Sequence, residues 1–433
     1  MSALDVETRR SPLRAILSRR VLPIFAVTIF TSALLLFAVE PMFAKMALPS
    51  LGGSPSVWSI AMVFFQGLMF AGYCYAHALT RWMPPRHGAM LHAGMLCLAF
   101  MFLPVALHAG TAPPADGNPA FWLIGVFTVS VGLPFFVLSA HGPLLQAWFA
   151  RSGHRQADDP YFLYGASNIG SFAALIAYPL VIEPLFGLSA QSRAWAAGFV
   201  VLTVLIVVCA LCVFGRSGVG YTASAPVRDA DAGQPVRLTS ALSWMALAFV
   251  PSALLVSVTA HISADIAAAP LLWVIPLAIY LLTFVLTFRS RAAIAETTLA
   301  VLQPWIAAAV LMAMCIGSFP FLALNLLSHL GLFVVNALVC HAALYRQRPH
   351  ARDLTLFYAA MSLGGALGGI FAGLAAPMLF SSVVEYPLLV AAALFCRPGV
   401  FADLRALDRT SALKTAVTAL ALVAAAWVLI FVA

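Results

Sequence analysis

Charged residues are scarce in this chain of 433 residues: only 9% are Asp, Glu, Lys or Arg, whereas 63% are hydrophobic. In soluble domains roughly a quarter of the residues are charged, so this composition excludes an ordinary soluble protein. Apolar runs of about 20 residues span a bilayer as helices, because a helix satisfies its own backbone polar groups. The sequence therefore predicts an all-α polytopic membrane protein in contact with the lipid bilayer.

Motifs for catalysis and cofactor binding are also missing. The seven cysteines lie in apolar segments without a disulfide framework or zinc-type spacing, and the one-turn separation of Cys209 and Cys212 fits helix packing. The glycine-rich stretch 364–369 lies inside an apolar helix, so it predicts no phosphate-binding loop. No serine-hydrolase elbow or zinc-protease motif occurs. We therefore expect no catalytic residue and no cofactor, while enzyme activity stays open.

The arginines predict the orientation of the helices. The basic tail 1–20 is followed by twelve apolar segments and by a thirteenth at 411–433, and the first run is too long for a cleavable signal peptide. If the tail is cytoplasmic, the opposite loops hold only Arg193, which agrees with the positive-inside rule. The cytoplasmic loops then hold Arg81, Arg86, Arg151, Arg155, Arg216, Arg228, Arg237, Arg289, Arg291, Arg346, Arg348, Arg352, Arg397, Arg405 and Arg409.

This asymmetry explains the sequence pI of about 9.3 without nucleic-acid binding. We expect a bacterial inner (cytoplasmic) membrane protein with a cytoplasmic N-terminus and an extracytoplasmic C-terminus. The linker 217–240, which contains Gly, Ala, Asp and Pro, separates the first six helices from the rest. The predicted parts are a tail (1–20), a six-helix half (21–216), the linker (217–240), a second six-helix half (241–397), and a basic link with an additional transmembrane helix (398–433).

The two predicted halves contain similar stretches in the same order. Residues 32–35 and 252–255 both read SALL, residues 162–171 align with 356–365 without a gap, and His141 and His341 occupy similar places. Such matches indicate a 6+6 parallel repeat, the arrangement found in major-facilitator transporters. The alternative is chance similarity between helices that are all rich in Ala, Leu and Gly.

Ionisable residues inside apolar segments mark candidate functional sites, because they are costly to place in lipid. One group is predicted near the extracytoplasmic ends of the helices and is a candidate for substrate or proton binding: Glu40, Lys45, Glu183, His261, Asp265 and Glu385. The SALL alignment places Lys45 opposite Asp265. That pair either takes part in transport or only locks the halves together, and the acids could also simply reach the membrane interface.

A second group, His77, His141 and His341, is predicted near the cytoplasmic ends. Histidine titrates near neutral pH, so these residues are candidates for an inner gate or a proton relay. Packing histidines are the alternative, and haem or metal ligation is a third. Small residues predict close helix packing at Gly170, Gly364, Gly365 and Gly368, with Asn168 on the same helix as Gly170.

Several longer stretches resemble a known bacterial family. They are VEPMFAKMALPSLGGSPSVW (39–58), DPYFLYGASNIGS (159–171), DIAAAPLLWVIPLAIYLLTF (265–284) and FYAAMSLGGALGG (357–369). They are similar to the membrane domain of fused major-facilitator/spermidine-synthase-like proteins. The resemblance implies the membrane fold over about residues 20–390, but the nucleotide-binding fingerprint of an aminopropyltransferase is absent, so it does not imply polyamine synthesis.

These observations favour a transporter-like protein for a small, cationic or amine-bearing solute, with coupling to protons as one option. A membrane-embedded enzyme or a haem- or metal-binding protein is one alternative. The other is a scaffold subunit that binds a membrane protein partner through residues 411–433.

Overall fold

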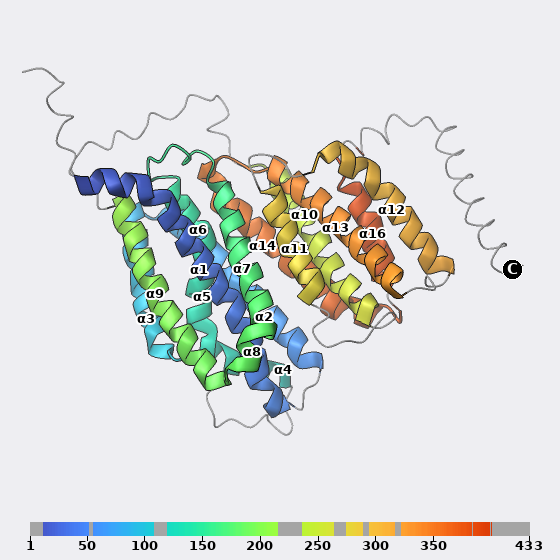
Figure 1. Ribbon diagram of the computed structural model, residues 1–433, viewed down its shortest axis with the longest axis horizontal. Coiled ribbons are helices and arrows are strands. Elements are labelled where there is room, and N and C mark those ends of the chain that lie inside the picture. The colour runs from blue at the N-terminus through green and yellow to red at the C-terminus, as the bar shows by residue number, and fades with distance from the viewer. Residues whose placement is uncertain are drawn as a thin grey trace, which may run out of the picture. The chain divides into compact units, whose positions relative to one another are not determined.

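The computed structural model describes residues 12–51, 55–107, 119–214, 236–263, 274–288, 294–316, 322–382, 384–398 and 400. These residues form helices and connecting turns, with no β-strand among them (Figure 1). The predicted thirteenth segment (411–433) and Asp265 lie outside the described residues.

The helices follow the predicted order of twelve apolar segments. The first three segments correspond to α1 (Pro12–Leu51), α2 (Pro55–Trp82), and α3 (Pro85–Ala99) with η1 (Phe100–Phe102). The fourth comprises α4 (Pro119–Phe127), η2 (Thr128–Gly132), α5 (Leu133–Ser139) and α6 (His141–Phe149). The fifth comprises η3 (Pro160–Phe162), α7 (Leu163–Ala177), η4 (Tyr178–Ile182) and α8 (Glu183–Leu185), and the sixth is α9 (Leu188–Phe214). The seventh to tenth segments correspond to α10 (Leu238–His261), α11 (Val274–Thr287), α12 (Glu296–Ile316) and α13 (Leu322–Arg346). The eleventh comprises η6 (Ala351–Asp353), α14 (Leu354–Ile370), η7 (Phe371–Ala375) and α15 (Ala376–Leu379), and the twelfth is α16 (Glu385–Phe395).

Nine helices of the described part are long and apolar enough to cross a membrane, and α11 and α16 are shorter apolar helices. Helix α9 shows why such a segment is stable in a bilayer. One face is buried in the bundle at Trp195, Phe199, Leu202, Ile206 and Cys209, which recur at helical spacing. The other face exposes large apolar side chains that suit contact with lipid, at Val200, Val201, Val204, Val207 and Leu211.

The contacts divide the chain into two units. The first comprises Met1–Leu242 with Arg348–Leu363, and the second comprises Ser243–Gln347 with Gly364–Ala433. Each unit has its own apolar core, which contains Phe25, Phe127, Phe135, Phe149 and Phe199 in the first and Val258, Leu332, Phe333, Leu389 and Val390 in the second. The division differs from the predicted halves, because residues 348–363 pack with the first unit.

Two of the membrane helices share an unusual order of turns. Residues 160–185 form a 3₁₀ turn, an α-helix, a π-helical turn and a final α-helical turn, which are η3, α7, η4 and α8. Residues 351–379 repeat this order as η6, α14, η7 and α15. These are the fifth and eleventh predicted segments. The shared order agrees with an internal repeat, although the repeat of six helices as a whole stays a prediction.

Three of the predicted packing glycines lie where two helices approach closely. A Cβ atom at Gly170 would overlap the carbonyl oxygen of Phe30 on α1, and one at Gly364 or Gly368 would overlap the carbonyl oxygen of Met245 or Phe249 on α10. Only a residue without a side chain fits these positions.

The other two predicted packing residues make different contacts. A Cβ atom at Gly365 would meet no atom within 4 Å, but the Gly365 carbonyl accepts a hydrogen bond from Ser252 at 2.8 Å. The Asn168 amide nitrogen donates to the Tyr164 carbonyl in its own helix at 2.8 Å.

Candidate functional site

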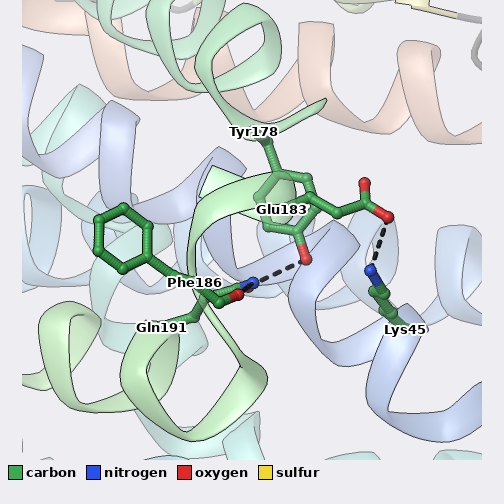
Figure 2. A network of polar contacts seen from close by, with 5 residues as sticks. All are labelled: Lys45, Tyr178, Glu183, Phe186 and Gln191. Atoms are coloured by element: carbon green, nitrogen blue, oxygen red, sulfur yellow. Dashed lines mark hydrogen bonds and ion pairs between the residues drawn. The ribbon is translucent and has the colours of Figure 1, made fainter. Parts of the chain in front are cut away.

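Lys45 and Glu183 form an ion pair in the first unit, with 2.6 Å between Lys45 Nζ and Glu183 Oε1 (Figure 2). Lys45 lies near the end of α1, and Glu183 begins α8, directly after the π-helical turn η4. Because Asp265 lies outside the described residues, the expected Lys45–Asp265 pair stays a prediction, and Glu183 is a partner of Lys45 that the sequence did not indicate. Helix α1 packs against α7, which continues through η4 into α8, and this packing brings Glu183 to Lys45.

The backbone around Glu183 is held by a second set of hydrogen bonds. The Tyr178 hydroxyl donates to Gln191 Oε1 at 3.1 Å, and Gln191 Nε2 donates to the Phe186 carbonyl at 2.7 Å (Figure 2). Tyr178 precedes Glu183 and Gln191 follows it, and both side chains are buried. These bonds fix the turn between α8 and α9 and so the position of the Glu183 carboxylate.

Two buried or half-buried carboxylates have no cationic partner in the described part of the chain. The ion pairs there are Lys45–Glu183, Arg346–Glu296 and Arg348–Asp159. Glu40 is half-buried on α1, which stays helical through the adjacent Pro41, and Glu385 begins α16 with only 6% of its surface exposed. Isolated carboxylates are costly in such surroundings, so these positions favour a proton or a cation as a partner.

A cluster of aromatic and histidine rings lies beside Glu385 in the second unit. His261 ends α10, and its ring centroid is 4.5 Å from that of His329 on α13. Tyr386, next to Glu385, stacks on His261 at 5.3 Å, and its hydroxyl is 2.9 Å from His329 Nδ1. The structure thus brings His261 to the first turn of α16, which also contains Glu385.

Each of the three inner histidines contacts a hydroxyl group through Nδ1. His77 lies 2.9 Å from Thr355 Oγ1 and His141 lies 3.0 Å from Ser32 Oγ in the first unit. In the second unit His341 lies 2.9 Å from Thr283 Oγ1. His141 and His341 are fully buried, whereas His77 is half-buried.

Sequence reasoning did not identify two further polar groups inside the helices. His92 on α3 is fully buried, and its ring centroid is 5.0 Å from that of His141. In the second unit Gln303 Nε2 on α12 donates to Asn336 Oδ1 on α13 and to the Ala393 carbonyl on α16, both at 2.9 Å. The sequence pattern that could have revealed His92 is its helical spacing from Gly88, Leu96 and Ala99, which places it on the buried face of α3.

No group of three or more His, Cys, Asp or Glu side chains within the described ranges is arranged to hold a metal ion. Of the predicted residues, the structure brings together Lys45 with Glu183, and His261 with the segment that contains Glu385. Glu40 and the three inner histidines lie apart from these two groups in their contacts.

No protein family and no curated protein matches the sequence. Solved structures do match the fold. The proton:xylose symporter XylE, which is from E. coli and belongs to the major facilitator superfamily, matches with a TM-score of 0.55 and 14% identity over 87% of this chain and 95% of that chain. A bacterial homologue of the iron transporter ferroportin gives 0.53 and 14%, over 86% and 96%. A peptide transporter of the POT family gives 0.50 and 13%, over 90% and 97%.

These similarities show the fold. The chain is a multi-pass membrane protein with an all-α fold like that of the major-facilitator transporters. The predicted fold class is confirmed in this respect, whereas the predicted extra C-terminal helix lies outside the described residues.

Proposed function

We propose that the chain is a transporter for a small, cationic or amine-bearing solute, and that transport is coupled to protons. The fold shared with sugar, iron and peptide transporters supports the transport part of this proposal. The chemistry of the buried acids supports the solute class.

The observation that favours a cation is the absence of a positive partner for Glu40 and Glu385 within the described part of the chain. A carboxylate that is shielded from water is stabilised either by taking up a proton or by binding a positive charge. A transporter can use this choice, since exchanging a proton for a cationic solute keeps the site neutral.

The second unit offers the more complete solute site. Glu385 supplies a buried carboxylate for an ammonium group, and the next residue, Tyr386, stacks on His261, so that this turn also supplies ring faces, which attract cations. His329 is within hydrogen-bond distance of the Tyr386 hydroxyl and provides a titratable group at the same place. In this proposal Glu385 binds the solute, Tyr386 and His261 contact it, and His329 exchanges protons.

Other parts of the prediction extend the same proposal. We propose that the protein resides in a bacterial inner membrane with a cytoplasmic N-terminus. We also propose that its membrane part corresponds to that of the fused major-facilitator/spermidine-synthase-like family. Residues 411–433 bind a membrane protein partner in this proposal. Lys45 and Glu183 neutralise each other, so we assign them to positioning α1 and α8 rather than to solute binding.

Uptake by lipid vesicles containing the full chain tests this function. We expect labelled putrescine, a diamine, to accumulate inside the vesicles when the proton gradient is directed outward, because protons then leave in exchange for the solute. Labelled xylose is the uncharged comparison. Glu385→Gln removes the charge but keeps the shape, and we expect it to lower putrescine flux at least about tenfold, which corresponds to roughly 1.4 kcal/mol.

Glu296→Gln is the matched control, because Glu296 is a half-exposed carboxylate paired with Arg346 in the same unit. Its flux should equal that of the wild type. Equal flux in Glu385→Gln and Glu296→Gln, or transport of neither solute under any gradient, would contradict the proposal.

A further inference from the structure

A pair of fully buried histidines lies inside the first unit, away from the acids and the ion pair described above. His92 on α3 and His141 at the start of α6 are both 0% exposed, and their rings meet edge to face at 88°. The Tyr75 ring on α2 lies 6.0 Å from His92, and the Trp148 ring lies 6.3 Å from it. The pair is therefore enclosed by α2, α3 and α6.

Several polar atoms of this group are buried without a hydrogen-bond partner in the described part of the chain. They are His92 Nδ1, His92 Nε2, His141 Nε2 and the Tyr75 hydroxyl. Nearly all buried polar atoms in folded proteins have a partner, and exceptions require an explanation. Four such atoms at one place indicate a site that accepts something small and polar.

Hydrogen bonding at Ser32 indicates how His141 is protonated. We assign the Ser32 proton to the Leu138 carbonyl, 3.4 Å away, so that a Ser32 lone pair accepts from His141 Nδ1–H at 3.0 Å. His141 Nε2 is then a bare acceptor. A neutral His92 has one N–H donor and one acceptor, so it offers the complementary group to His141 in either tautomer.

The separation of the two rings suits a shared proton. Two imidazoles joined by an N–H···N hydrogen bond have centroids about 5 Å apart, since roughly 1.1 Å separates each centroid from its nitrogen and roughly 2.9 Å separates the nitrogens. The observed 5.0 Å equals this value. At this separation a nitrogen of one ring reaches a nitrogen of the other when the two atoms face each other.

We propose that His92 and His141 form a proton-binding pair that holds one proton between the two rings. Ser32 fixes the orientation of His141, and the Tyr75 hydroxyl passes protons to and from His92. The surroundings favour one proton rather than two, because a second positive ring at this distance would be repelled by the first.

The groups around the pair leave it without a counter-ion. None of the ion pairs among the described residues, Lys45–Glu183, Arg346–Glu296 and Arg348–Asp159, includes either ring. On the neighbouring helices, α2 supplies Tyr75, whose ring lies 6.0 Å from that of His92, and α1 supplies the Ser32 hydroxyl. The proton is therefore exchanged rather than stored permanently in an ion pair.

Nitrogen-15 NMR of histidine-labelled full-length protein in lipid bilayers tests the pair directly. At about pH 8 we expect His141 to carry its proton on Nδ1, and we expect a nitrogen–nitrogen coupling across the hydrogen bond between the rings of His92 and His141. Burial without a counter-ion disfavours the charged form, so on acidification to about pH 3 both rings should change together in a single step. Two rings that stay neutral throughout, or that titrate separately without coupling, would overturn the proposal.

Two variants on α3 provide the matched comparison. His92→Gln should abolish the coupling and shift the His141 signals, whereas His87→Gln, which replaces an exposed histidine of the same helix, should leave both unchanged. If His92→Gln does not fold, Ser32→Ala serves instead, and the preference of His141 for Nδ1–H should be lost in it. Unaltered His141 signals in the variant that is measured would contradict the assignment.

Proton binding by this pair does not depend on transport, but its use in transport rests on the proposed function. In vesicles, His92→Gln should abolish proton movement that accompanies putrescine while putrescine itself still moves down its gradient. If no solute moves in the wild type, the proposed function fails, whereas the NMR result still decides whether the pair binds a proton.

Discussion

Lys45 Nζ lies 2.6 Å from Glu183 Oε1, although 138 residues separate the two side chains in the sequence. The pair joins the end of α1 to the short helix α8, and each side chain keeps more than a third of its surface exposed, 39% for Lys45 and 34% for Glu183. Such a partly exposed pair contributes positioning more than stability.

We expect Lys45→Met and Glu183→Gln each to destabilise the protein modestly, by on the order of 1 kcal/mol, because each leaves its partner without a counter-charge. The exchanged pair Lys45→Glu with Glu183→Lys should recover most of the loss. Thermal unfolding in detergent of the wild type, the two single variants and the double variant Lys45→Met with Glu183→Gln forms a double-mutant cycle that measures this coupling. Additive losses would show that the two side chains act independently.

Close packing at glycine predicts a sharp difference between neighbouring positions. Gly170→Ala and Gly364→Ala should lower stability by roughly 1–3 kcal/mol, because the new methyl group would overlap the Phe30 or Met245 carbonyl. Gly165→Ala and Gly365→Ala are the matched controls, since nothing lies within 4 Å of a Cβ atom there. These two should be neutral or stabilising by up to about 1 kcal/mol, as alanine favours helix more than glycine does. Equal effects at all four positions would contradict the packing.

The buried amide pair in the second unit predicts a non-additive result. Gln303→Leu leaves Asn336 Oδ1 and the Ala393 carbonyl without their donor, so it should cost roughly 1–3 kcal/mol. Gln303→Leu with Asn336→Leu removes both side-chain amides and should cost less than the sum of the single changes. Chemical unfolding of the four proteins in mixed micelles provides the comparison. A double variant that loses the full sum would rule out the pair as a unit.

The hydroxyl of Tyr386 predicts a specific effect on transport. Tyr386→Phe keeps the ring against His261 but removes the partner of His329 Nδ1, so we expect proton-driven putrescine uptake to fall roughly fivefold. Facilitated exchange of putrescine at equal pH on both sides should change much less. Tyr345→Phe, at a tyrosine of the same unit outside this cluster, is the control. A loss of both activities to the same degree would indicate a structural role for the hydroxyl.

Much of the fold follows from the sequence, because long apolar runs must become helices in a bilayer. The helices agree in order with the predicted segments, including short ones such as α11 and α16. The contact between Lys45 and Glu183 did not follow, because the repeat alignment relates positions in two halves and says nothing about which helices touch. Glu183 had been recognised as an unusual residue, but only the packing of α1 against α7 shows that it meets Lys45.

The histidines show a similar limit. His261 and Glu385 stand out as polar residues in apolar surroundings, yet Tyr386, which follows Glu385 and stacks on His261, is unremarkable in the sequence. His92 was not identified because α3 is short and its first turn contains Arg86 and His87, which are exposed. Its place among the buried residues of α3 becomes evident only when the helix boundaries are known.

The π-helical turn η4 has a consequence for any experiment that assumes a regular helix. A π turn inserts one extra residue, which rotates every following side chain by about 100° around the axis. A helical wheel drawn through α7 without this insertion would direct Glu183 away from Lys45, and the same error would recur after η7. For spin labels or cross-linking cysteines placed beyond Ile182 or Ala375, the direction of each side chain therefore has to be assigned from a helix that includes the π turn.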